Sequence, residues 1–265
     1  MRLHGLIIDP QEDFCNPSGS LFVPGAEKDM ARLAVMVQRL GSRIIDLHVT
    51  LDSHHTLDIA HPIWWQDVDG DHPTPFTIIT PDDVASGRWQ AADPASRDRS
   101  HEYVQHLAAN GRYPLCIWPY HCLIGSGGHA VVPELFSALR EWEASALTPV
   151  DFVTKGSNIW TEHYSALRAD VPDSTDPTTL LNETLIQSLR GADLIFIAGE
   201  AGSHCVANTV RDIVEAFGDP VLLQKLVLLT DATSPVTGFE PLQDAYLADM
   251  AALGLKTATT EDFLA

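Results

Sequence analysis

The chain is poor in basic residues. It carries 16 lysines and arginines against 36 aspartates and glutamates, so that its formal net charge is −20 over 265 residues. A surface of this charge repels nucleic acid phosphates and anionic lipid headgroups, because all three carry the same sign. The composition therefore argues against a nucleic acid partner and against binding to a membrane surface.

Long apolar runs are also missing. No stretch of the sequence approaches the roughly 20 apolar residues that cross a bilayer, and the N-terminus MRLHGLIIDP does not have the layout of a signal peptide. We therefore expect a soluble, cytoplasmic protein.

Cysteine is scarce, and nucleotide-binding motifs are absent. The four cysteines lack the dense spacing of a disulfide scaffold, and 45% of the residues are hydrophobic, enough for a sizeable core. We expect reduced thiols, with Cys116 and Cys122 as the nearest pair if a disulfide forms. The first apolar run is not followed by G-x-G-x-x-G, and G-x-x-x-x-G-K-[ST] does not occur, which argues against a nucleotide cofactor.

Short apolar runs rich in β-branched residues alternate with amphipathic stretches. The runs are LHGLII, RIIDLHVT, PLCIW, PVDFVT, DLIFIAG and KLVLLT. Apolar positions three and four apart predict helices at 26–40, 131–145, 178–190, 205–217 and 240–253. The alternation predicts an α/β fold with a doubly wound, mostly parallel six-stranded sheet, covered by helices on both faces in three layers.

One segment breaks the alternation. Residues 62–114 are rich in proline and aspartate and contain only short stretches that could form helices. We therefore expect a single domain over 1–265 with this insertion after the second strand, where it could cap the functional site.

Polar residues follow the apolar runs, where ligands bind in open parallel sheets. Asp9 closes the first run, Asp52 and His54 follow the second, Lys155 ends VDFVTK, and Cys205 comes a short turn after DLIFIAG. Because the carboxyl ends of parallel strands share one edge of a sheet, we expect these five side chains to lie close together.

Cys205 is a candidate nucleophile, because a glycine-containing turn places it near the start of a helix. Unpaired N–H groups and a nearby lysine there predict a lowered thiol pKa, and the same N–H groups can bind an oxyanion. Asp9 could exchange the thiol proton, while Lys155 holds Asp9 ionised or stabilises developing negative charge. The alternatives are a small buried hydrophobe, a carboxylate that caps a turn and a solvated lysine.

Asp52 and His54, together with His121 in WPYHC, form a candidate metal site. A carboxylate with imidazoles suits Zn²⁺, Fe²⁺ or Mn²⁺. His61 is the candidate fourth ligand and His55 its substitute. The alternative is a set of solvated or hydrogen-bonded histidines, because the chain contains 12 histidines in all.

Several segments together resemble the nicotinamidase/pyrazinamidase branch of the isochorismatase-like cysteine hydrolases, over nearly the full length. They are LIIDPQEDFC, GSLFVPGA, VTLDSHH, WPYHCLIGSGGH, VTKGSNIWTEHYSAL and GEAGSHCVANTVRDIVEAFG. The resemblance implies an isochorismatase-like, Rossmann-like fold and a homo-oligomer. It implies catalytic roles for Asp9, Lys155 and Cys205. It also implies a divalent metal, Zn²⁺ first, held by Asp52, His54 and His121 with His61 as a further ligand.

The resemblance extends to the pocket. It implies that Phe14 stacks on the substrate, that Trp118 lies in the pocket wall, and that the backbone N–H groups of Ala201 and Cys205 form an oxyanion hole near an unusual cis peptide bond. This chain departs from the family at Glu200, Gly202 and Ser203, where an aliphatic residue, threonine and aspartate are common. The departure predicts a change in pocket polarity.

The expected function is hydrolysis of a small planar carboxamide through a thioester on Cys205, with nicotinamide giving nicotinate and ammonia as the best single candidate. A related amidohydrolase acting on a carbamoyl or ureido compound is the alternative, because Glu200 and the insertion could admit a more polar substrate. An isochorismatase would leave Cys205 without a purpose. A non-catalytic metabolite-binding module on the same fold is a further alternative.

Overall fold

The computed structural model describes residues 1–265, and its centre is a six-stranded sheet. The strands are β1 (Leu3–Ile8), β2 (Ile44–Asp52), β7 (Asp151–Lys155), β8 (Leu194–Gly199), β9 (Leu226–Leu229) and β10 (Lys256–Ala258). Their order is β10-β9-β8-β1-β2-β7, and every neighbouring pair is parallel. The predicted doubly wound parallel sheet is confirmed.

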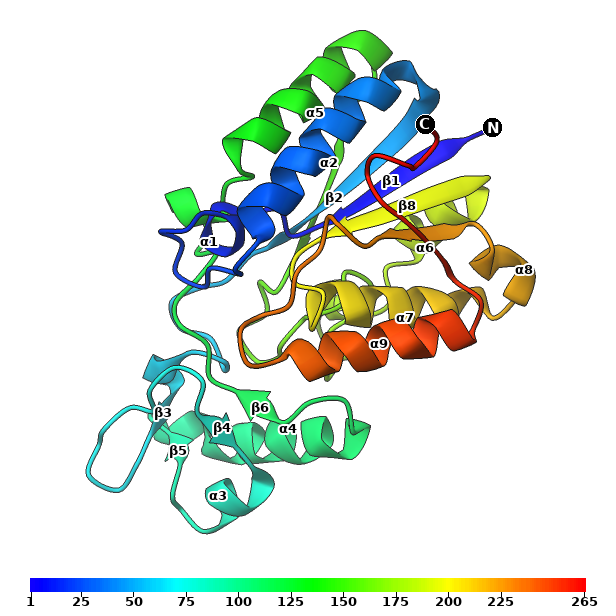
Figure 1. The fold of residues 1–265 in the computed structure, drawn as a ribbon. Helices are drawn as coiled ribbons and strands as arrows, with labels where there is room; N and C mark the ends of the chain where they lie inside the picture. Colours follow the sequence, from blue (N-terminus) through cyan, green and yellow to red (C-terminus); the bar gives the residue numbers. More distant parts are fainter.

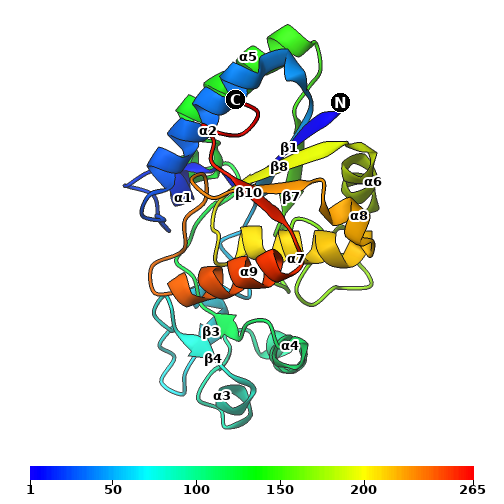
Figure 2. The same ribbon diagram turned by 45° about the vertical axis from the view of Figure 1, so that its right-hand side comes forward.

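Helices cover both faces of the sheet. On one face α2 (Ala26–Leu40) packs against α5 (Pro133–Ala146), and the other face carries α6 (Glu183–Gly191), α7 (Cys205–Phe217) and α9 (Glu240–Ala252), as Figures 1 and 2 show. The helix expected over 178–190 begins only at Glu183. Its start is fixed by Asn182, whose side chain accepts a hydrogen bond from the backbone N–H of Leu185. Two short helices, α1 (Glu12–Cys15) and α8 (Pro220–Leu223), complete this part of the chain.

One predicted sheet strand is wrong. Of the run PLCIW only Leu115–Cys116 forms a strand, β6, and it pairs antiparallel with β4 (Ile78–Ile79) in a separate two-stranded sheet. The sixth strand of the main sheet is instead β10, which has exposed residues and no apolar pattern because it lies at the edge. Apolar composition predicts a strand in PLCIW but does not tell which strand will pair with it.

The insertion forms a lobe of its own beyond the main sheet (Figure 1). It contains α3 (Pro81–Ala85), α4 (Arg97–Asn110) and a second small sheet of β3 (Trp65–Gln66) with β5 (Gln90–Ala91). Within the lobe the buried Trp64 donates a hydrogen bond to Ser100 on α4 at 3.0 Å. None of the helices in the molecule is both long enough and apolar enough to span a membrane.

The strand order places the loops that follow β1 and β8 next to each other. The sheet is wound outward in both directions from these two central strands, so the loop after β1 leads to one face and the loop after β8 to the other. A crevice forms at such a reversal point, where ligands of doubly wound sheets bind. Asp9 follows β1 there and Cys205 begins α7, so the topology alone brings both to one place.

Candidate active site

A tight turn between β8 and α7 presents Cys205. Gly199 has a φ of 115°, and a side chain there would collide with the backbone of Ile8 in the neighbouring strand. The Glu200–Ala201 peptide bond that follows is cis, as the resemblance implied. Cys205 is the first residue of α7 and is buried, as is Ala201. Both line one pocket at the crevice.

Lys155 joins the three groups that sequence reasoning selected. Its Nζ atom lies 2.9 Å from Asp9 Oδ2, 3.0 Å from Asp52 Oδ1 and 3.6 Å from Cys205 Sγ. Lys155 is only 2% exposed and Asp9 is fully buried. The thiol, the carboxylate and the ammonium, far apart in the chain, therefore meet within a single buried cluster.

Asp9 is held so that one of its oxygens points to the ammonium. Its backbone has a φ of 45°, unusual for a residue other than glycine and typical of functional sites. The Thr50 hydroxyl accepts a hydrogen bond from the backbone N–H of Asp9 and donates one to Asp9 Oδ1. Sequence reasoning missed Thr50, because its role depends on the pairing of β2 with β1 and not on a local motif.

The surroundings of Asp9 raise the pKa of its carboxyl group, so it binds a proton more readily than an exposed aspartate does. Burial raises the pKa of the Asp9 carboxyl, the Lys155 ammonium opposes this rise, and the Asp52 carboxylate adds to it. Asp9 Oδ2 forms an ion pair with the Lys155 ammonium but accepts no hydrogen bond of good geometry. That oxygen can therefore exchange a proton with a neighbouring group.

The predicted lowering of the Cys205 pKa is wrong. Burial raises the pKa of the thiol well above its usual range, Lys155 lowers it, and the carboxylates of Asp9 and Asp52 raise it further. Desolvation and two negative charges outweigh one lysine and the helix start. The sulfur therefore rests as a protonated thiol, so a nucleophilic role requires that the thiol first lose its proton.

Alkylation of Cys205 without substrate tests this protonation state. We expect the rate with iodoacetamide to be low at pH 7 and to keep rising with pH beyond the range of an ordinary cysteine, because only the thiolate reacts. Mass mapping of the labelled peptide follows the reaction at residue 205, and a Cys205→Ala variant gives the background. A rate that has already levelled off at pH 7 would show instead that the thiolate is the resting form.

Three side chains form the candidate metal centre. Asp52 Oδ2 lies 3.1 Å from His54 Nε2 and 3.4 Å from His121 Nε2, and all three residues are buried. Ligands about 2.0–2.1 Å from a tetrahedral Zn²⁺ lie roughly 3.3 Å from one another. The spacing of these donor atoms therefore fits such an ion.

The second nitrogen of each ring is fixed in the way metal-binding histidines require. His54 Nδ1 lies 3.0 Å from Asp58 Oδ2, and His121 Nδ1 lies 2.8 Å from the carbonyl oxygen of Pro119. His61 packs beside these rings and directs Nδ1 to backbone carbonyls, while its buried Nε2 has no partner. Burial lowers the pKa of His61 to about 4, so the ring is neutral and its Nε2 is free to bind an ion. By contrast, His55 is exposed.

Several aromatic side chains line the pocket that contains the thiol. Its lining includes the predicted Phe14 and Trp118, joined by Tyr164 and His204. The Trp118 indole N–H donates to Glu162 Oε2 and to the Tyr164 hydroxyl, both at 3.0 Å, which fixes the plane of the ring. The lining therefore offers aromatic faces to a ligand beside Cys205 and beside two of the candidate metal ligands, Asp52 and His121.

His163 also lines the pocket, and sequence reasoning missed it. The backbone N–H of Gly156 donates to His163 Nδ1 at 3.3 Å, so the ring proton must lie on Nε2. That Nε2 atom is buried without a partner, and burial lowers the pKa of His163 to about 3. The ring is therefore a neutral hydrogen-bond donor. It lies in the segment VTKGSNIWTEHYSAL, but its direction depends on the fold around Gly156.

Glu200 does not line the pocket, contrary to the expected change in polarity. Its Oε2 accepts a hydrogen bond from the backbone N–H of Ser234 at 3.0 Å, and its carboxyl group contacts Asp29. Burial, followed by the Asp29 carboxylate, raises the pKa of Glu200 well above its usual range, so it acts as a protonated carboxyl group behind the turn.

The insertion supports the pocket wall from behind and contributes no lining residue between positions 62 and 114. Phe76 packs edge-on against Trp118, with ring centroids 5.8 Å apart. Tyr113 stacks on His204, and its hydroxyl donates to the backbone oxygen of Ser203 at 3.0 Å. The lobe therefore stiffens the wall and does not cover the thiol.

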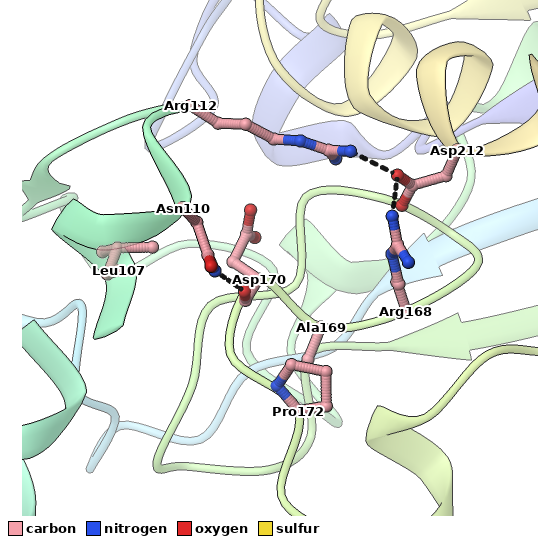
Figure 3. A pocket seen from close by; sticks show the side chains of 8 residues that line it. All are labelled: Leu107, Asn110, Arg112, Arg168, Ala169, Asp170, Pro172 and Asp212. Carbon is pink, nitrogen blue, oxygen red and sulfur yellow. Dashed lines mark hydrogen bonds and ion pairs between the residues drawn. The ribbon is translucent and has the colours of Figure 1, made fainter. Parts of the chain in front are cut away.

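A larger cavity of about 290 Å³ lies between the end of α4 and the body of the protein (Figure 3). Arg112 and Arg168 both face it, but their guanidinium groups pair with Asp212 at 2.7 and 3.0 Å. Its cations are already neutralised and it holds no nucleophile, so the smaller pocket at Cys205 is the better candidate site.

Comparison with known proteins gives structural matches only. No protein-family model and no curated protein sequence matches the chain. The yeast nicotinamidase bound to the inhibitor nicotinaldehyde is similar, with 18% identity, a TM-score of 0.67, and coverage of 97% of this chain and 99% of that one. A zinc-bound pyrazinamidase of Pyrococcus horikoshii has 18% identity and a TM-score of 0.58, and coverage is 98% and 99%.

An isochorismatase-like hydrolase from Alkaliphilus metalliredigens is similar as well, at 17% identity and a TM-score of 0.54, with coverage of 100% of this chain and 98% of that one. The three likenesses cover 97%, 98% and 100% of this chain. They show that the chain has the isochorismatase-like fold, the fold of the nicotinamidases and pyrazinamidases, and confirm the resemblance at the level of the fold.

Proposed function

We propose that the protein is a cysteine-nucleophile amidohydrolase of small planar carboxamides, with nicotinamide as its leading substrate. The observation that carries the proposal is the position of the Lys155 ammonium, 2.9 Å from Asp9 and 3.6 Å from the Cys205 thiol, beside a pocket walled by Phe14 and Trp118. The yeast nicotinamidase and the pyrazinamidase with the same fold support this reaction class.

The residues account for each proton. Asp9 takes the thiol proton as Cys205 Sγ bonds to the amide carbon, and the carbonyl electrons move to the oxygen, which the N–H groups of Ala201 and Cys205 would bind. Asp9 then protonates the departing ammonia and a thioester remains. Asp9 next takes a proton from water as the hydroxyl adds, and the carboxylic acid leaves as the thiol regains its proton. Lys155 offsets the charge of Asp9 throughout.

A divalent metal fits the second cluster. Asp52, His54 and His121 would hold it, with His61 as a fourth ligand, and Zn²⁺ is the leading candidate because the donors are imidazole and carboxylate. When bound, the ion supplies a Lewis acid that orients a substrate ring nitrogen or a water molecule. The zinc-bound pyrazinamidase with this fold supports the assignment.

Ammonia release from a panel of carboxamides tests the proposed function. We expect purified protein to release ammonia from nicotinamide and pyrazinamide, and much less from ureido compounds. Glu200 lies outside the pocket, so it cannot form the polar contacts that would favour a ureido substrate. Ammonia from ureido compounds alone would replace the leading substrate class. Binding by calorimetry without turnover would point to a metabolite-binding module.

The metal assignment gives a separate expectation. An Asp52→Ala variant should retain about one equivalent less metal per chain than the wild type, because the remaining histidines lose their shared carboxylate. Metal content is measured after gel filtration, with Asp69→Ala, which changes an exposed residue of the insertion, as the control. Equal metal content in Asp52→Ala and the wild type would remove this cluster from the mechanism.

His163 predicts a preference among substrates. If its Nε2–H donates to the ligand, a His163→Phe variant should lose about 10-fold or more in kcat/KM, equivalent to about 1.4 kcal/mol, for carboxamides with a ring acceptor. Benzamide, which has no ring nitrogen, should lose less. Kinetics of nicotinamide and benzamide with both proteins check this, and an equal loss for both substrates would assign His163 a purely structural role.

A further inference from the structure

A second group of metal-binding side chains lies near the opposite end of the sheet. His4 lies on β1, Asp46 and His48 on β2, and Asp151 begins β7. The strand register pairs His4 with Asp46 and His48 with Asp151. Paired residues in neighbouring strands, and residues two apart in one strand, point to the same face. Three strands therefore present four polar side chains to one face, which α6 covers through Ser188.

These polar groups are exceptional for their position. Strands of a parallel sheet are covered on both faces and are normally apolar, yet His4 is 7% exposed and His48 2%. A buried polar atom without a partner costs free energy and needs an explanation. His4 Nδ1 is such an atom. Burial also lowers the pKa of His4, which keeps the ring neutral and able to offer a lone pair.

His48 has the surroundings of a metal ligand. Its Nδ1 lies 2.7 Å from Asp151 Oδ2, an arrangement that places the ring proton on Nδ1 and leaves Nε2 as the donor of a lone pair. Nε2 lies 3.7 Å from Asp46 Oδ2 and 3.0 Å from the Ser188 hydroxyl. One ligand atom from each of His4, Asp46 and His48 lies within 4.8 Å of the others.

We propose that His4, Asp46 and His48 form a second divalent-metal site, suited to Zn²⁺, in which Asp151 orients His48. Two imidazoles and one carboxylate are a common zinc donor set, and binding an ion would draw these donor atoms closer together than they now lie. The side chains of Asp46 and Asp151 are 32% and 52% exposed, which gives an ion a route from solvent.

The role of this site is structural. His48 lies four residues before Asp52 on β2, about 13 Å along the strand, so the ion is remote from the reacting atoms. It would tie β1 to β2, next to the edge strand β7, at the end of the sheet that lacks the catalytic cluster. An ion that binds only the folded chain stabilises it. The inference does not depend on the proposed amidase activity.

Zinc stoichiometry of the full-length protein tests the proposal. Protein stripped with a chelator is titrated with Zn²⁺ by calorimetry. We expect two equivalents for the wild type and one for His4→Gln. His106→Gln, which changes an exposed histidine on α4, is the matched control and should keep two. Asp151→Asn should keep two, with the affinity of one site about 10–100-fold weaker.

A variant that lacks the metal ligands near Cys205 allows zinc binding at the second site to be measured alone. The His54→Ala/His121→Ala variant should bind one equivalent, and Zn²⁺ should raise its Tm. Adding His4→Gln should abolish both effects, while circular dichroism confirms that the chain is folded. Equal stoichiometry in the wild type and His4→Gln, or no zinc in the His54→Ala/His121→Ala background, would overturn the proposal and leave a buried cluster of hydrogen-bonded side chains. These readouts do not require amidase activity.

Discussion

A Cys205→Ala variant should lose carboxamide hydrolysis by a factor of at least about 10³ while still binding nicotinamide. The side chain that would form the thioester is gone, but Phe14 and Trp118 still line the pocket and the candidate metal ligands are unchanged. Ammonia release measures the loss of turnover, and calorimetry with nicotinamide measures the binding.

Cys116→Ala is the matched control, because it removes another buried cysteine that does not line the pocket. It should keep turnover close to that of the wild type. Intermediate trapping adds a further check, since mass spectrometry of wild-type protein quenched during turnover should find the acyl group on residue 205. Turnover retained by Cys205→Ala would exclude thioester chemistry, even if the protein does hydrolyse amides.

Sequence periodicity predicted most of the sheet, because buried parallel strands are apolar on both faces. The runs around β1, β2, β8 and β9 stand out for this reason, and α2 and α7 begin and end at the predicted residues. The edge strand β7 is largely exposed and was predicted from its apolar and β-branched composition. Prediction failed at the opposite edge of the sheet. β10 is a short edge strand with exposed residues, so it has no apolar pattern to detect.

The candidate catalytic side chains were predictable because topology places the ends of parallel strands together. Asp52 and Lys155 end strands of one sheet, and Asp9 and Cys205 come shortly after two others, so their meeting requires only the order of those strands. The ionisation state of the thiol was not predictable. It depends on how much water is excluded and on the distances to two carboxylates, neither of which a motif contains.

Glu200 and His163 illustrate the same limit at the pocket. A glutamate in the turn before the nucleophile suggested a polar pocket, but its side chain turns toward Asp29 and Ser234. His163 lies in the segment VTKGSNIWTEHYSAL that carries Lys155, but its tautomer follows from one backbone N–H of Gly156. Side-chain direction in loops depends on contacts from elsewhere in the chain, so the local sequence does not reveal it.

Replacing Lys155 by methionine should both abolish activity and destabilise the protein by about 3–5 kcal/mol at pH 8, because it leaves buried carboxylates without their cation. Asp9 bears most of this cost. Burial already raises its pKa in the folded state, and removal of the ammonium raises it further. A carboxyl group whose folded pKa exceeds its unfolded pKa destabilises the fold as the pH rises above the unfolded value. The loss should therefore be smaller at pH 5 than at pH 8.

A double-mutant cycle separates this charge effect from a loss of packing. In Asp9→Asn/Lys155→Met the charge on Asp9 is gone, so the double variant should be more stable at pH 8 than Lys155→Met alone, and its stability should depend less on pH. Denaturant unfolding at pH 5 and pH 8 measures all four proteins. If the two substitutions were simply additive, the ammonium would not be what keeps Asp9 ionised, and a mechanism in which Asp9 accepts the thiol proton beside Lys155 would lose its electrostatic basis.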